Sequence, residues 1–350
     1  MDSEDLVALI QGAQLDDRMT LEQRAAAKAG ISRRSALLDQ AAKDVVKAWT
    51  VAAGGPRTAI EDQAALARIA VLVRGMISKA LGGLGADAAG AVRRLLPSAV
   101  QLGIRHAIAA WRGQGGGPLA DLGRGSVPGA LLKDAAAIPG DVSAVQRAAA
   151  LLLKPALLRS LGLPAALAPL QKARGALDLV NAAMSRIIGG GLAHGGDRVS
   201  AAAGAPFEVW IAERDACARC QALSGHVVAA GSPFPGGLSL DPAQAVKGAK
   251  PVKPPLHPHC RCKLVPYDPA NHPPGAVTLP EAARREALRS AVRGFSLPSE
   301  SNASRLRAAE FAIQQAKPGD LPKSVIAYGR SAVRQGRFPR GRDVPNGPAS

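Results

Sequence analysis

The sequence is poor in aromatic residues and in cysteine. Phe, Trp and Tyr make up 3% of its 350 residues, and only four cysteines are present. Because Ala, Gly and Leu dominate instead, we expect a core packed through small residues and a mainly helical fold. Long apolar runs are also lacking. The most apolar stretch, 148–170, is interrupted by Pro155, Pro164 and two basic residues, which excludes a simple membrane-spanning helix.

A basic leader is missing as well. Residues 1–5 read Met-Asp-Ser-Glu-Asp, and this acidic start lacks the positively charged region of a secretory signal peptide. We therefore expect a soluble product of a reducing cytosol with no membrane partner. In that compartment, clustered cysteines favour metal binding over disulfides.

Motifs of common enzyme classes are absent from the sequence. The triplets Gly115–Gly117 and Gly189–Gly191 lack the Lys-Ser/Thr of a phosphate-binding loop, so we interpret them as helix breaks. There is no Gly-x-Ser-x-Gly elbow and no His-Glu-x-x-His frame that would supply a general base beside a catalytic metal. The sequence predicts a protein that is not an enzyme and has no small-molecule substrate.

Acidic residues are outnumbered by basic ones. The chain has 27 Asp and Glu against 44 Lys and Arg, a formal net charge of +17, and a pI near 10.5. Such an excess favours a polyanionic neighbour, most simply nucleic acid bound by non-specific electrostatics. An Arg-rich proteome is the alternative explanation, so charge alone does not name a partner.

Helical periodicity organises most of the chain. Residues 1–112 are predicted as an N-terminal helical region with a break at Pro97. Residues 113–129 are rich in Gly and Pro without periodicity and are predicted as a linker. Helices return at 141–203, interrupted at the prolines named above and at Gly189–Gly191.

Short β-strands are predicted further along. Residues 207–211 alternate apolar and polar side chains as a half-buried strand does, and 226–228 and 263–265 are two more candidates. A Pro/Gly/Lys loop fills 231–255, a length that marks a functional or variable insertion. Residues 269–350 are predicted as a basic C-terminal helix and tail. The fold class expected is mainly α with a small α+β domain, in which short antiparallel strands surround the cysteines.

The four cysteines occur in two motifs, Cys217-Ala-Arg-Cys220 and His257-Pro-His259-Cys260-Arg-Cys262. Thiolates two residues apart on a tight turn can bind one metal ion, and a second turn can complete the tetrahedron. Because more than four candidate ligands are available, no position needs to stay open, which is typical of a structural Zn²⁺ site. The preferred ligands are Cys217, Cys220 and Cys260, with either Cys262 or His257 as the fourth.

These residues also admit other interpretations. The thiols could form disulfides after release into an oxidising medium, or stay buried without metal. Catalytic zinc is disfavoured because Glu213 and Asp215, which precede the first motif, suit a charged edge or a turn cap better than a general base. His106 and His194 are isolated in sequence, and we interpret both as ordinary helix or turn residues.

Residues 210–268 resemble the phage Mu F-like head morphogenesis family of minor capsid proteins. The matching residues are Trp210, Cys217, Cys220, Leu223, Gly225, His257, Pro258, Cys260, Arg261 and Cys262. Two turns depart from the family pattern: Ser224 stands where Asp is usual, and the acidic turn reads Glu213-Arg-Asp-Ala. Both concern turn chemistry, and Ser can cap a turn much as Asp does.

The resemblance implies a structural role in a phage or prophage head. It places a head morphogenesis domain at 130–268, with its core at 177–268. The implied partners are portal and capsid proteins and packaged DNA. The implied location is the virion head, with the host cytoplasm during assembly. The alternative function is a non-catalytic zinc-knuckle protein that binds nucleic acid, for which aromatic side chains should be available near the knuckle to stack on bases.

Overall fold

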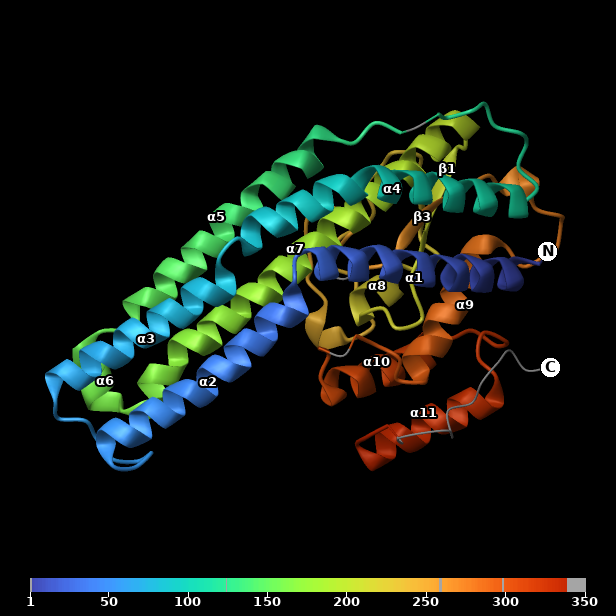
Figure 1. Cartoon of the computed structure of the whole chain (residues 1–350). Coiled ribbons are helices and arrows are strands. Elements are labelled where there is room, and N and C mark those ends of the chain that lie inside the picture. Colours follow the sequence, from blue (N-terminus) through green and yellow to red (C-terminus); the bar gives the residue numbers. More distant parts are fainter. Residues whose placement is uncertain (1, 124, 258–259, 298, 339–350) are drawn as a thin grey trace. The chain divides into compact units, whose positions relative to one another are not determined.

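The computed structural model describes residues 2–338 except 124, 258–259 and 298. The chain is 66% helical, with a small three-stranded antiparallel sheet near the Cys/His cluster, which confirms the predicted fold class. Its elements (Figure 1) are α1 (Ser3–Lys28), α2 (Ile31–Ala53), α3 (Gln63–Leu81), α4 (Leu84–Gly113), α5 (Gly129–Leu151), α6 (Pro155–Leu161), α7 (Leu163–Ala203), β1 (Phe207–Ile211), α8 (Ala218–Leu223), β2 (Val227–Ala229), η1 (Pro242–Gln244), β3 (Lys263–Tyr267), η2 (Pro269–Asn271), α9 (Leu279–Val292), α10 (Asn302–Gln315) and α11 (Lys323–Gln335).

Two compact units divide the chain. The sheet unit comprises Met1–Met19, Pro97–Ser126 and Gly189–Ser350, and the helical unit comprises Thr20–Leu96 and Val127–Ile188. The chain passes from one unit to the other within α1, α4 and α7, and once in the segment before α5. In the part of the chain that the structure describes, no helix is long and apolar enough to cross a membrane. The end of the predicted basic tail, 339–350, and His259 lie outside the described residues.

The helical unit is held together by apolar stripes at helical spacing. In α2 the side chains of Leu38, Val45 and Trp49 are fully buried, and α3 packs against α2, α5 and α6. Gly54 ends α2 in the left-handed conformation, with φ at 73°. A glycine adopts this conformation without the steric cost that a Cβ would add.

A buried arginine joins three helices of this unit. The guanidinium of Arg34, on α2, donates to the carbonyls of Ala80 and Gly82 at the end of α3, at 2.9 and 2.5 Å. It also pairs with the carboxylate of Asp87 on α4, at 2.6 Å. The last carbonyls of α3 therefore gain donors that the helix itself cannot supply.

Two predicted helix breaks are wrong. α4 continues through Pro97, and α7 continues through Gly189–Gly191. Beside the proline, Leu96 is fully buried, so burial outweighs the lost hydrogen bond. In the sheet unit α7 packs closely against α4 one turn further on, since a Cβ at Gly195 would clash with the carbonyl of Val100. Tertiary packing thus stabilises helix where local propensity disfavours it.

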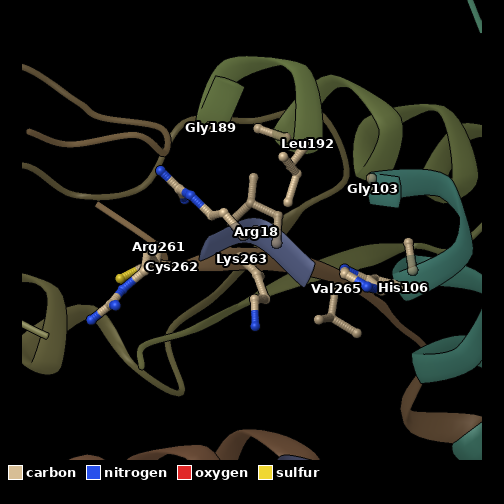
Figure 2. Close-up of a pocket in the computed structure, with 13 residues that line it drawn as sticks. Arg18, Gly103, His106, Gly189, Leu192, Arg261, Cys262, Lys263 and Val265 are labelled. Atoms are coloured by element: carbon tan, nitrogen blue, oxygen red, sulfur yellow. The ribbon is translucent and has the colours of Figure 1, made fainter. Parts of the chain in front are cut away.

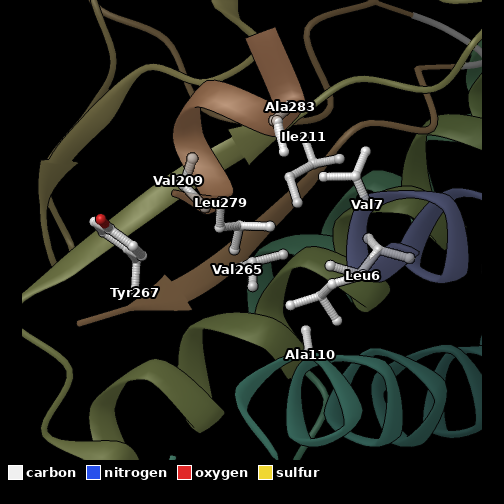
Figure 3. Close-up of a cluster of buried hydrophobic side chains, with 11 residues drawn as sticks. Leu6, Val7, Ala110, Val209, Ile211, Val265, Tyr267, Leu279 and Ala283 are labelled. Carbon is white, nitrogen blue, oxygen red and sulfur yellow. The ribbon is translucent and has the colours of Figure 1, made fainter. Parts of the chain in front are cut away.

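The sheet has the order β2-β1-β3 and is antiparallel throughout. β1 occupies the predicted range, and its register with β3 places Val209 opposite Val265 and Trp210 opposite Leu264. Because neighbouring residues point to opposite faces of a sheet, the two pairs enter different cores. Val209 and Val265 join a cluster that includes Leu6 of α1 (Figure 3). Trp210 and Leu264 join the cluster that contains the four cysteines.

The predicted C-terminal helix is α9, which begins at a capping box formed by Thr278 and Glu281. Two further helices, α10 and α11, follow it and pack against it. Their apolar faces form a third core with Ala218 of α8 and Leu240 of the long loop. The basic C-terminal segment is therefore built into the sheet unit as far as α11.

Candidate metal centre

The first cysteine motif lies across the start of α8. Cys217 is the N-cap of this helix, with extended backbone angles, and Cys220 lies in its first turn. The backbone N–H of Gln221 donates to the carbonyl of Cys217 at 2.9 Å, which closes the first helical turn. The two-residue spacing thus directs both thiols to one side of a helix end.

The second motif lies on the turn that leads into β3. The N–H of Cys260 donates to the carbonyl of His257 at 3.0 Å, and Cys262 directly precedes Lys263, the first residue of β3. The sheet joins the two motifs, because β1 leads to the first cysteine pair and β3 follows the second, and the two strands are paired.

These elements bring all five predicted ligands together in two groups. One group consists of Cys217, Cys220 and His257, and the other of Cys220, Cys260 and Cys262, with the ligand atoms of each group within 4.8 Å of one another. Cys220 belongs to both groups. The four cysteines are all buried, and none is in a disulfide. Either group could hold a metal ion.

Two of the three distances within the groups fit a tetrahedral thiolate and imidazole site, and the third, from Cys217 to His257, is shorter. Ligands at about 2.3 Å for sulfur and 2.0–2.1 Å for nitrogen place two sulfurs about 3.8 Å apart, and a sulfur and a nitrogen about 3.5 Å apart. The Sγ atoms of Cys220 and Cys260 are 3.7 Å apart. The Nε2 atom of His257 is 3.4 Å from Sγ of Cys220 and 3.0 Å from Sγ of Cys217. The residues present therefore fit a metal of this class.

The thiols differ in how easily they lose a proton. A hydrogen bond from Cys220, aided by His257, lowers the pKa of Cys217 to about 5. Contact with Cys220 likewise lowers the pKa of Cys260. The pKa of Cys220 is raised by its contacts with the other thiols, and that of Cys262 is raised mainly by burial. Close packing of ionisable thiols in an apolar setting is the arrangement that a bound cation stabilises.

An apolar shell surrounds the five ligands. The rings of Trp210 and Phe234 meet edge to face with centroids 5.3 Å apart, and both side chains are fully buried. Phe234 is fixed by paired backbone hydrogen bonds with Val252, each of 2.9 Å. The long loop between the cysteine motifs is therefore tied to the metal centre through its own aromatic anchor.

Charged groups support the turn behind the second motif. Arg18 of α1 donates to the carbonyl of Cys260 at 2.6 Å, and Arg261 pairs with Asp215. Lys263 and Glu213 form a buried ion pair at 2.5 Å. Burial raises the pKa of Glu213 and lowers that of Lys263, while each ion offsets the burial cost of its partner.

These contacts revise part of the prediction. Glu213 is 4% exposed, so its interpretation as a charged edge residue is wrong: the buried lysine ammonium compensates its charge. Arg18 was not identified from sequence, and no local pattern could have found it, since its partner lies 242 positions further along the chain. For Lys263 the one available signal was a lysine next to the last cysteine at the start of an apolar strand.

A small cavity lies beside β3, on the side where α1, α4 and α7 approach it (Figure 2). His106 lines it, with Nε2 3.3 Å from a carboxylate oxygen of Asp17. Burial lowers the pKa of His106 to about 4, against the opposing effect of Asp17. The imidazole is therefore neutral at physiological pH. His106 is separate in sequence from the metal centre, yet it lines the same cavity as Cys262.

The site is thus a group of four buried thiols and one half-buried imidazole, held by a short helix, a paired sheet and buried charges. These residues could hold a metal ion. Comparison of the chain with models of protein families, with curated proteins and with solved structures finds no match in any of the three.

Proposed function

We propose that this chain is a minor head protein of a phage or prophage, that it acts in head morphogenesis, and that a structural Zn²⁺ ion holds its sheet unit together. The observation that carries the proposal is the assembly of both halves of the family-like motif, Cys-x-x-Cys and His-Pro-x-Cys-Arg-Cys, into one buried cluster. The proposed role is binding rather than catalysis, at the portal and capsid and beside packaged DNA.

The donor set supports zinc over other metals. Soft thiolates with an imidazole select Zn²⁺, Cu⁺ or iron–sulfur clusters, whereas Mg²⁺ and Ca²⁺ prefer oxygen. The distances from Cys220 to Cys260 and to His257 are those of a tetrahedral zinc site, whereas Cys217 and His257 lie about 0.5 Å closer together. When bound, the ion would cross-link the start of α8 to the turn before β3. The ligand set would be Cys217, Cys220 and Cys260 with either His257 or Cys262.

The alternative of a nucleic-acid-reading zinc knuckle has less support. Phe234 is the one aromatic residue between Arg214 and Lys263, and its side chain is fully buried against Trp210. A buried ring cannot stack on a base. DNA contact in this proposal is therefore electrostatic, which fits the net charge of +17.

The function is tested in purified heads. The prophage that encodes the chain would be induced, and full and empty heads would be separated and analysed by quantitative mass spectrometry. We expect the chain in both, at a few copies per head, and we expect heads to fail when the gene is deleted. Normal heads without the chain, or a chain found only free in the lysate, would refute the proposal.

A further inference from the structure

An open groove lies next to the metal centre, on the side of the long loop. It has a volume of about 530 Å³, within the range of roughly 300–1,000 Å³ that is typical of ligand sites. Its walls are α8, α9, α10 and residues 236–248 of the loop. All of these belong to the sheet unit, and α8 packs against both α9 and α10.

The groove combines apolar walls with positive charge. Leu238, Leu288 and Phe311 line it, and Val246, which is 52% exposed, stands at its edge. Lys247 and Arg284 are among the described residues that line the groove, and no Asp or Glu is. The structure gives no ion pair for Lys247 among the described residues, so this ammonium is available to a ligand.

The second cation is fixed in place. Arg284 is held by Asp320, whose carboxylate it meets at 2.7 Å, and by the carbonyl of Gln315, also at 2.7 Å. Burial, together with the charge of Arg284, lowers the pKa of His226, which also lines the groove. At neutral pH the uncompensated positive charge of the groove therefore comes from Lys247, because Asp320 pairs with Arg284.

The loop wall of the groove is preformed. Gly237 has a φ of 77°, and a Cβ there would clash with the carbonyl of Val246. The N–H of Val246 donates to the carbonyl of Gly237 at 2.9 Å, and Asp241 is held by two hydrogen bonds of 2.7 Å from Arg307. Little conformational entropy would be lost on binding, because the wall is already ordered.

We propose that this groove binds an acidic segment of another protein, in which a large apolar side chain stands next to a carboxylate. The apolar side chain would lie against Phe311 and the exposed Val246, and the carboxylate would meet Lys247. Duplex DNA fits less well, since its phosphates would face apolar walls. The inference builds on the proposed function, because it places the contact with a head partner at this groove.

Binding should also depend on the metal. α8 carries Cys220, and the loop wall runs between the two cysteine motifs. A metal ion bound by both motifs would therefore fix both ends of the loop. We expect removal of the metal with a chelator to weaken binding to the groove by at least about tenfold, which corresponds to roughly 1.4 kcal/mol.

The test uses the full chain and a random peptide library displayed on phage. We expect selected peptides to be enriched in Asp and Glu next to Leu or Phe. One selected peptide would then be titrated against the wild-type chain, Lys247→Glu and Val246→Asp, with an expected loss of about tenfold or more for each variant. Lys250→Glu is the matched control, because it makes the same charge change on the same loop but does not line the groove.

Three results would overturn the inference: no acidic enrichment, equal weakening by Lys247→Glu and Lys250→Glu, or displacement of the peptide by a short DNA duplex. The last result would identify a phosphate-binding surface instead. Both lysines are exposed, and thiol protection of each variant would verify that it is folded. If peptide binding fails while the chain retains its metal and enters heads, the groove inference alone is wrong.

Discussion

Asp241 offers a direct test of how the long loop is held in place. Its side chain is 0% exposed and forms an ion pair with Arg307, whose side chain is 45% exposed. It also accepts a hydrogen bond from the N–H of Ala243 at 3.0 Å, which caps η1. The change Asp241→Asn keeps the oxygen that caps η1 and removes the charge.

The expected loss in the free energy of unfolding follows from this geometry. Removing one partner of a buried ion pair costs about 3–5 kcal/mol, and water solvates the half-exposed arginine, so we expect about 2–3 kcal/mol. Hydrogen bonds from Arg307 hold the pKa of Asp241 below its usual value. The charged form therefore stabilises the fold above about pH 4, the unfolded pKa, and this stabilisation is lost as the pH falls through the lower folded pKa.

The assay is hydrogen exchange at the amides of Leu240 and Val246, both of which donate to backbone carbonyls. A matched control is available, because Asp268 caps η2 in the same Asp-Pro-Ala sequence, with its carboxylate 2.9 Å from the N–H of Ala270. We expect Asp241→Asn to speed exchange at these amides and to weaken the pH dependence of their protection between pH 5 and 3. Asp268→Asn should have neither effect at these amides. Equal effects of the two changes would refute the reasoning.

Four further predictions concern the metal centre and the helical unit. Cys220→Ser should weaken zinc binding more than any other single change, as measured in a competition titration with a chromophoric chelator. If a zinc-binding free energy of about 10–16 kcal/mol is shared by four ligands, the loss is about 100-fold or more. Of His257→Ala and Cys262→Ser, we expect one to weaken binding comparably and the other to have little effect; two equal large losses would contradict a four-ligand site. Chelation should expose the amides of β1 and β3 to exchange while those of α2 and α3 stay protected. Arg34→Met should destabilise the helical unit by about 3 kcal/mol, since it removes a donor from the carbonyls of Ala29, Ala80 and Gly82 and leaves Asp87 without its partner. The urea dependence of amide exchange in α3 measures this loss, and an unchanged urea midpoint would be the contrary result.

The sequence was informative where local pattern and tertiary environment agree. Strand β1 was predicted to the residue, because its alternation reflects two real cores, one on each face of the sheet. The cysteine cluster was predicted because ligand spacing is a local property of a turn.

Prediction failed where distant packing decides the structure. The run Gly189–Gly191 is typical of a break in isolation, yet α7 continues through it and packs against α4 at Gly195. The buried pair of Glu213 and Lys263 and the contact of Arg18 with Cys260 join residues far apart in the chain. The groove beside α8 depends in turn on α10, which the composition of the C-terminal segment did not reveal as a separate helix.

The most direct test of the account is the metal content of freshly purified protein, by elemental analysis, with a count of reactive thiols on the same sample. The account predicts one zinc per chain and four thiols that react only after chelation. A metal-free chain whose four cysteines react at once would contradict it.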